Sequence, residues 1–341
     1  MSYVRDVSST AGSIAPPLVG AGCDGWTDHI FGLELRGGFP APWIASGVEP
    51  SSRAPVVHTH VVSEDDAGKL WCEGDAKRLV NWRFDDGSAL LSIDCHPDAG
   101  FRLCALRQGI HMVSADGSHI WSCPDGADDW VWQRYLMGQV LPLASILNGL
   151  EPLHASAVEI DGKAVAFAGP SGRGKTSLGL NLVLRGARFL TDDVAATNLL
   201  DGQPMVNPGP RVANLDKDED LLLGPRRARL GQPLGFDETG VRLRLCGPAG
   251  QRSPLRALYF FDRGADCPQV RFDELRGVPY AMFLQHCFTP FLSTPERMLN
   301  QLETLTAIAN RVRVFQLSVP VTMSASDLSG HVESHVRNEL D

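Results

Sequence analysis

The sequence predicts an α/β protein in which a β-rich N-terminal region precedes a domain of alternating strands and helices. Short runs of β-branched and apolar residues, separated by Asp-Gly pairs, fill the first part of the chain. From about residue 153 onward, apolar runs alternate with segments of helical periodicity. Strands joined by tight turns are typical of antiparallel sheets, whereas strands that alternate with helices are typical of parallel ones.

The β-rich region is predicted between residues 28 and 123. Strands are expected at residues 56–62, 89–95 and 101–106, where β-branched and apolar side chains gather. Asp86-Gly87 and Asp116-Gly117 are typical of turns between strands. Because no helix of crossover length intervenes, we expect a meander or a small barrel rather than a parallel sheet.

A helix is predicted at residues 128–148, capped by Asp128 or Asp129. Its apolar stripe consists of Trp132, Leu136 and Val140. Pro142 is expected to kink or split this helix, because proline has no backbone N–H to donate.

Strands and helices alternate in the second half of the chain. Strands are expected at residues 154–160, 164–168, 188–190, 255–261 and 312–317, and helices at 175–185 and 295–310. Thr294 is the expected cap of the last helix, whose buried face would include Leu299, Leu302 and Ala309. The polar stretch from Ser324 is expected to fray.

These patterns divide the chain into four predicted parts. Residues 1–127 form a β-rich domain of unknown role and residues 128–150 a bridging helix. Residues 151–325 form the α/β domain, and residues 326–341 a polar tail.

Composition narrows the classes of function. The net charge of −9 and the pI of about 5.6 disfavour a nucleic-acid partner, which clustered Lys and Arg would have to neutralise. No run approaches the ~18 apolar residues of a membrane helix, so no membrane association is expected. Residues 1–17 lack the pattern of a secretory signal. Eight scattered Cys without a CxxC spacing predict reduced thiols and a cytoplasmic protein.

A glycine-rich loop between a predicted strand and a predicted helix is the strongest chemical signal. The sequence Gly169-Pro170-Ser171-Gly172-Arg173-Gly174-Lys175-Thr176, followed by Ser177, fits G-x-x-x-x-G-K-[ST]. Glycines let backbone N–H groups turn towards phosphate oxygens, and the helix that follows presents the positive end of its dipole. Lys175 would contact the β- and γ-phosphates, and Thr176 would offer its hydroxyl to Mg²⁺. The loop therefore predicts ATP binding.

Two carboxylates and one imidazole belong to predicted strands that lie close to this loop in the sequence. Asp192 and Asp193 end the strand that follows the loop's helix. An Asp pair at that place can hold Mg²⁺, take a proton from a hydroxyl, or divide these tasks, although an isolated pair is often only a turn. If this strand neighbours the strand before the loop, the pair faces the loop. His154 starts the strand at 154–160, and a lone His there is as often structural as functional.

Over residues 153–211 the chain resembles HPr kinase/phosphorylase and the HPr-kinase-related proteins found with peptide-modifying genes. The similar residues are His154-Ala-Ser-Ala-Val, the loop 169–176, and Arg185-Gly-Ala-Arg-Phe-Leu-Thr-Asp-Asp193. The resemblance thins towards Val319 and does not extend to the first 150 residues. It implies an α/β P-loop fold like the core of phosphoenolpyruvate carboxykinase.

The resemblance also implies roles for residues of this sequence. Lys175 and Thr176 would bind phosphates and Mg²⁺, and one Asp of the pair would act as the base while the other lies near the metal. We assign Thr176 and Asp193 to Mg²⁺, and place His154 in the same pocket. The stretch at residues 207–211 departs from the Arg-Gly-Leu-Gly signature of that family, which leaves the reverse reaction, the HPr substrate and the homo-oligomer open. Arg211 is a candidate contact for phosphate or substrate.

The sequence therefore predicts an ATP- and Mg²⁺-dependent kinase for a hydroxyl of a peptide or protein. A small-molecule acceptor, such as a sugar, nucleoside or antibiotic, and a non-catalytic nucleotide sensor that binds a partner protein remain alternatives. The choice between ATP and GTP is open.

Three further patterns each have two interpretations. His58 and His60 share one face of a strand and could contribute to a metal site only with a third ligand. His286 and Cys287 either line a substrate cleft or belong to a core helix. Trp71, Trp82, Trp121, Trp130 and Trp132 either fill a core or form a peptide- or partner-binding face.

Overall fold

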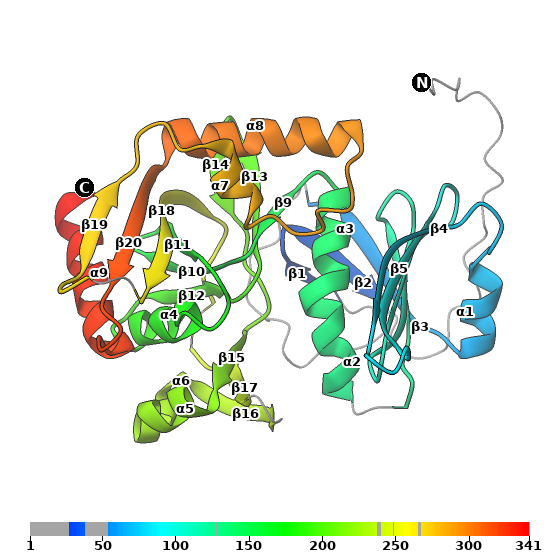
Figure 1. The fold of residues 1–341 in the computed structure, drawn as a ribbon, viewed down its shortest axis with the longest axis horizontal. Helices are drawn as coiled ribbons and strands as arrows, with labels where there is room; N and C mark the ends of the chain where they lie inside the picture. The colour runs from blue at the N-terminus through cyan, green and yellow to red at the C-terminus, as the bar shows by residue number, and fades with distance from the viewer. Residues whose placement is uncertain are drawn as a thin grey trace.

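The computed structural model describes residues 27–37, 54–126, 129–236, 240–247, 249–264 and 267–340. These residues form a mixed α/β fold with three sheets and a minority of helices (Figure 1). We call residues 27–150 the N-terminal unit and residues 151–340 the C-terminal unit. The predicted lead-in at residues 1–17, Cys23 and the predicted cap Asp128 lie outside the described residues.

The N-terminal unit contains an eight-stranded sheet in the order β1-β2-β3-β8-β7-β6-β5-β4. The strands are β1 Thr27–Ile30, β2 Leu33–Gly37, β3 Val56–Val61, β4 Lys77–Arg83, β5 Ala89–His96, β6 Gly100–Ala105, β7 Gly109–Val113 and β8 His119–Cys123, with helix α1 Glu64–Leu70 after β3. Strands β4 to β8 form the predicted meander, with Gly87 and Gly117 at positive φ in its turns. The expectation of no parallel pairing is wrong at β3, which runs parallel to β2 and β8. Long connections on both sides of β3 allow this pairing.

The predicted helix at 128–148 forms three consecutive segments. They are α2 Asp129–Tyr135, the π-helical turn η1 Leu136–Val140, and α3 Leu141–Leu147. The predicted stripe of Trp132, Leu136 and Val140 is buried against the sheet. Pro142 lies in the first turn of α3, and the N–H of Leu141 bonds to the carbonyl of Leu136, five residues earlier. The split is therefore a π-turn that precedes the proline.

The C-terminal unit is built on a nine-stranded sheet. Its main path is β12-β10-β11-β18-β14-β13-β9, and β20 pairs with β18 and β19. The strands are β9 Glu151–Leu153, β10 Ala155–Ile160, β11 Lys163–Ala168, β12 Arg188–Thr191, β13 Ala195–Leu200, β14 Gln203–Val206, β18 Ser253–Arg263, β19 Arg271–Glu274 and β20 Arg313–Val319. The sequence left open whether β11 and β12 are neighbours, and they are not, because β10 lies between them and pairs antiparallel with both.

Helices cover the two faces of this sheet. Helices α4 Lys175–Leu184 and α9 Ala325–Glu339 pack on one face, and α7 Tyr280–Leu284 and α8 Pro295–Arg311 on the other. Alternate residues of β11 point to opposite faces, Val165 towards α4 and Ala166 towards α8. Both layers therefore fix the strand that leads into the glycine-rich loop.

The C-terminal helix α9 shows that the expectation of a fraying tail is wrong. Ser324 caps it by accepting a hydrogen bond from the N–H of Asp327 at 3.0 Å. Leu328, Val332 and Val336 recur every four residues and are fully buried against the sheet. Such a narrow stripe suffices to dock a helix whose other residues are polar.

Helix α8 begins as predicted, because Thr294 accepts a hydrogen bond from the N–H of Arg297. Its predicted buried face is wrong at Leu299 and Leu302, whereas Ala309 packs partly buried against the core. Leu299 and Leu302 are 58% and 50% exposed, whereas Leu305 and Ile308 are buried with Thr304 and Arg297. Arg297 is buried because Glu151 and nearby carbonyl groups accept its hydrogen bonds.

A smaller sheet of β15 Val212–Asp216, β17 Gly240–Leu245 and β16 Gly231–Phe236 completes the C-terminal unit. It carries α5 Lys217–Leu223, η2 Gly224–Arg226 and α6 Arg227–Leu230. Asp216 caps α5, so the acidic run 216–220 forms a helix start. The first residues of β15 lead this sheet away from the edge of the large sheet (Figure 1).

The two units meet where the β1–β2 turn contacts the loop after β14. The N–H of Phe31 donates a hydrogen bond of 2.7 Å to the carbonyl of Pro208. A Cβ on Gly209 would lie 2.2 Å from the hydroxyl of Thr191 and 2.8 Å from the ring of Phe31. Only glycine fits between them. Helices α2 and α3 lie between the two large sheets (Figure 1), and one core cluster includes residues of both units.

Candidate functional site

The glycine-rich loop joins β11 to α4 as the sequence predicts. Gly172 and Gly174 have φ of 73° and 96°, which side chains other than glycine rarely adopt. A Cβ on Gly169 would approach the carbonyl of Phe261 to 2.7 Å, so this position requires glycine for space. Pro170, Ser171, Gly172 and Arg173 are exposed, and Ser177 is buried in the first turn of α4. The loop therefore presents its backbone at the N-terminus of a helix, an arrangement that suits anions.

Lys175 is buried inside this loop. Its ammonium donates hydrogen bonds to the carbonyls of Gly169 at 2.8 Å and Pro170 at 3.0 Å. Burial lowers the pKa of Lys175, and the carboxylates of Asp193 and Asp192 oppose that shift. The Lys175 ammonium is thus held within the curve of the loop by uncharged carbonyl groups, which an anion can replace as its partners.

Asp192 is the buried member of the carboxylate pair. Its Oδ1 accepts hydrogen bonds from Ser156 at 2.6 Å and from Thr176 at 2.8 Å, and its Oδ2 accepts one from the N–H of Asn214 at 3.1 Å. Burial, and then the charge of Asp193, raise the pKa of Asp192 to about 7. The hydroxyl of the glycine-rich motif is therefore in contact with Asp192. Thr176 thus bonds to Asp192, whereas the sequence assigned Thr176 and Asp193 to Mg²⁺.

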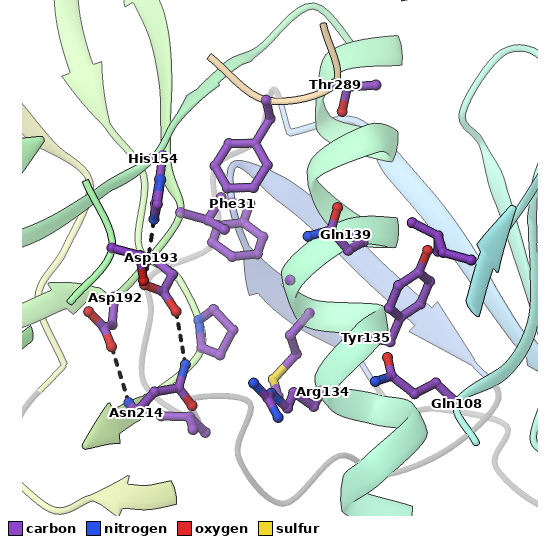
Figure 2. Close-up of a pocket in the computed structure, with 18 of the residues that line it drawn as sticks. Phe31, Gln108, Arg134, Tyr135, Gln139, His154, Asp192, Asp193, Asn214 and Thr289 are labelled. Carbon is purple, nitrogen blue, oxygen red and sulfur yellow. Dashed lines mark hydrogen bonds and ion pairs between the residues drawn. The ribbon is translucent and has the colours of Figure 1, made fainter. Parts of the chain in front are cut away.

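Asp193 lies beside His154 at the wall of a cavity (Figure 2). It has a φ of 63°, its side chain is 46% exposed, and its Oδ2 accepts a hydrogen bond of 2.9 Å from the amide of Asn214. This left-handed residue turns the chain between β12 and β13, so the two consecutive carboxylates point to different surroundings. One carboxylate is buried beside Thr176, and the other is open to the cavity.

His154 lies on the same side as Asp193. Its Nε2 is 3.9 Å from Oδ1 of Asp193, and its ring meets that of Phe288 edge-on. Burial and the charge of Lys175 lower the pKa of His154, and Asp193 opposes the shift. The structure thus brings His154, Lys175, Asp192 and Asp193 together, although β12 does not neighbour β11.

The structure does not bring Arg211 into this group. Its guanidinium donates a hydrogen bond to the carbonyl of Gly247, and Arg211 is not among the residues that line the cavity. Arg173 also turns away, with a bond of 2.7 Å to the carbonyl of Arg263.

Two residues that contact the Asp pair were not predicted from the sequence. Ser156 and Asn214 hold the Asp pair from β10 and β15. Ser156 lies two residues after His154, so it points to the same side of the chain, and this spacing was a usable signal. Asn214 follows the pair by a long stretch of chain, and no local pattern marks it.

The cavity has a volume of about 860 Å³ and lies between the two units. Phe31 and the segment from Arg134 to Gln139 contribute to its wall opposite Asp193 (Figure 2). Cys287 and Phe288 line it too, whereas His286 is not among the lining residues. Both His286 and Cys287 follow α7, which ends at Leu284, so their interpretation as part of a core helix is wrong.

The remaining sequence signals lie elsewhere. His60 contacts His119 at 3.2 Å, and their rings stack with that of Trp121. Among the described residues, no group of three or more His, Cys, Asp or Glu side chains is arranged to hold a metal ion. Trp121 and Trp132 are buried, whereas Trp82 is exposed and lines the cavity; the side chain of Trp130 lies outside the described residues.

Within the described part of the chain, no helix combines the length and apolar character that a membrane crossing requires.

No family model and no curated protein matches the chain. Among solved structures, the chain is similar to the Hpr(Ser) kinase/phosphatase from Coxiella burnetii, with 14% identity and a TM-score of 0.30. The match covers 55% of this chain and 94% of that one. A likeness at this TM-score carries no argument, so the functional proposal rests on the residues of the site.

Proposed function

We propose that the protein is an ATP- and Mg²⁺-dependent kinase that transfers the γ-phosphoryl group to a hydroxyl of a peptide or protein. One observation carries this proposal: Asp192 is buried and contacts Thr176 of the glycine-rich loop, while the adjacent Asp193 has a half-exposed carboxylate beside His154 in the cavity. A kinase needs one group at the phosphates and one at the acceptor, and the consecutive carboxylates supply both.

The nucleotide phosphates would bind to the loop at residues 169–176. Backbone N–H groups and the start of α4 favour anions there. Lys175 would exchange its bonds to the carbonyls of Gly169 and Pro170 for bonds to phosphate oxygens. A bond from the ammonium to a charged phosphate oxygen is stronger than one to an uncharged carbonyl, which favours an occupied loop.

Thr176 and Asp192 would hold Mg²⁺. A hydroxyl and a carboxylate 2.8 Å apart are oxygen ligands of the kind that Mg²⁺ prefers, with substrate phosphates and water completing its shell. This proposal replaces Asp193 with Asp192 in the assignment made from the sequence. When bound, Mg²⁺ neutralises part of the charge on the β- and γ-phosphates.

Asp193 would act as the general base on the acceptor. Its carboxylate takes the proton of the acceptor hydroxyl, the acceptor oxygen forms a bond to the γ-phosphorus, and the bond from that phosphorus to the β,γ-bridging oxygen breaks to release ADP. Asn214 holds both carboxylates, through its N–H and its amide, and so keeps their relative orientation. His154 borders the same space as a largely neutral imidazole at neutral pH, because its pKa is lowered.

A small-molecule acceptor is the second candidate. The cavity volume of about 860 Å³ lies within the roughly 300–1,000 Å³ range of small-molecule pockets. A sensor without catalysis would have no need of a half-exposed carboxylate at the cavity side, so we place it last.

The test is incubation of the purified protein with γ-labelled ATP, Mg²⁺ and a panel of peptides and small hydroxyl compounds. We expect label on peptides, lost in Lys175→Ala and retained in Lys163→Ala, which removes an exposed lysine at the start of β11. ATP that binds but is never transferred would favour the sensor. Transfer that survives Lys175→Ala would contradict the role of the loop.

A further inference from the structure

The cavity lies on the acceptor side of the site. It includes Asp192, Asp193 and His154, but from residues 169–176 it touches only Ser171. Phosphates bound to the loop would therefore leave most of this space free. Asp193 borders the space, so an acceptor held there would meet its carboxylate.

The wall far from Asp193 is mostly apolar. Strands β4 and β5 contribute two cross-strand pairs on one face, Val80 with Ile93 and Trp82 with Leu91. Tyr135 and Met137 extend this surface towards the catalytic side. A polyhydroxylated ligand would lose hydrogen bonds to water against such a wall, whereas an apolar group would gain by being buried.

The π-helical turn η1 gives this wall its shape. Met137, Gly138 and Gln139 line the cavity, while Leu136 and Val140 at the ends of the turn are buried in the core. A Cβ built on Gly138 would meet no atom within 4 Å, and its φ is not positive. Neither packing nor backbone conformation requires glycine here, and glycine costs a helix about 1 kcal/mol relative to alanine. Its evident effect is to leave room in the cavity.

The cavity reaches solvent beside a free strand edge. Trp82 lines the cavity and is nevertheless 61% exposed. Strand β4, which carries it, is the last strand of its sheet and pairs only with β5 among the described residues. Amide side chains of Gln108, Gln139 and Gln285 lie among the apolar ones and match the donors and acceptors of a peptide backbone. A chain longer than the cavity can therefore continue out of it.

We propose that the acceptor is a peptide segment bound between the two units, and that the turn η1, through the space above Gly138, selects an apolar side chain next to the phosphorylated Ser or Thr. This inference rests on the proposed kinase function. The N-terminal unit then supplies acceptor selection, and the C-terminal unit supplies the phosphate chemistry.

The test uses short Ser peptides that carry Leu, Phe, Asp or Lys beside the Ser, with wild-type protein and Gly138→Leu. The leucine would occupy the space reserved for the peptide side chain. We expect wild-type protein to prefer Leu and Phe peptides. In Gly138→Leu their KM should rise at least about tenfold, with the Kd for ATP changed less than about twofold. Gly68→Leu is the matched control, because Gly68 is an exposed helical glycine in α1 whose Cβ would also meet nothing within 4 Å.

Two further measurements separate the possible failures. If the leucine of Gly138→Leu disturbs folding, Gly138→Ala replaces it in the same test, because alanine favours a helix. We then expect a smaller rise in KM for the Leu and Phe peptides. Direct titration of fluorescent Leu and Asp peptides without ATP reports binding independently of transfer. Peptide binding that Gly138→Leu weakens, without any transfer, would support the peptide site and contradict the kinase. Transfer with equal KM in both proteins, labelling of small compounds only, or no peptide binding by wild type would overturn the inference.

Discussion

The two walls of the cavity differ in how far apart their residues lie in the chain. The catalytic wall comes mainly from residues 154–193, where a strand, a loop and a second strand end place polar groups together. The apolar wall comes from β4, β5 and the turn η1, which belong to the other unit. Under the proposed function, chemistry and acceptor selection would thus reside in separate parts of the molecule. A substitution in one wall should change one property and leave the other intact.

The largest expected effect is at Asp193. Asp193→Asn keeps an acceptor for the amide of Asn214 and a residue that tolerates left-handed φ, but removes the base. We expect kcat to fall about 10²–10⁴-fold while the Kd for ATP stays within about twofold. Steady-state transfer and nucleotide titration measure both quantities. Asp201→Asn, at another left-handed Asp, is the control. Full transfer by Asp193→Asn would remove Asp193 from the mechanism.

Phe31 tests whether the walls are independent, because it touches both units. It is buried, it lines the cavity, and it has a φ of 52°, which is strained for a bulky residue. We expect Phe31→Ala to lower the free energy of unfolding by about 3–5 kcal/mol and to impair transfer as well. Urea unfolding measures this change, with the exposed Phe84→Ala, expected within about 0.5 kcal/mol, as control. Equal stability of the two variants would show that the contact between units is weak.

The smallest expected effect is a pH dependence confined to the catalytic wall. The pKa of Asp192 is raised to about 7 by burial and by Asp193, so between about pH 4 and pH 7 the folded protein holds a proton that the unfolded chain has lost. The stability that this proton contributes is complete below about pH 4 and is lost as the pH rises through about 7.

Asp192→Asn has no such proton to lose. Without nucleotide or Mg²⁺, wild-type stability should therefore fall relative to this variant by about 1–4 kcal/mol between pH 4.5 and pH 8. Urea unfolding of both proteins at the two pH values measures the difference. Parallel pH profiles would show that Asp192 is already ionised in the folded protein.

Predictions from local patterns agree well with the structure. The strands around the glycine-rich loop, the helix after it, the stripe from Trp132 to Val140 and the cap at Thr294 all appear where the sequence places them. The errors concern which face or which neighbour an element has, or whether a mostly polar segment forms an element at all. Leu299 and Leu302 lie on the exposed side of α8, and a narrow apolar stripe docks α9. Periodicity shows that a helix has an apolar side, but only its packing partners decide how much of that side is covered.

The sequence by itself determined the glycine-rich loop and the presence of two adjacent carboxylates. Glycine conformation, an apolar strand and a following helix are properties of consecutive residues. Tertiary structure alone decided that β10 separates β11 from β12, that Asp192 rather than Asp193 meets Thr176, and that strands of another unit wall the cavity. The physical reason is that strand order and the contact between units depend on pairing and burial between distant segments. No local spacing of residues encodes those interactions.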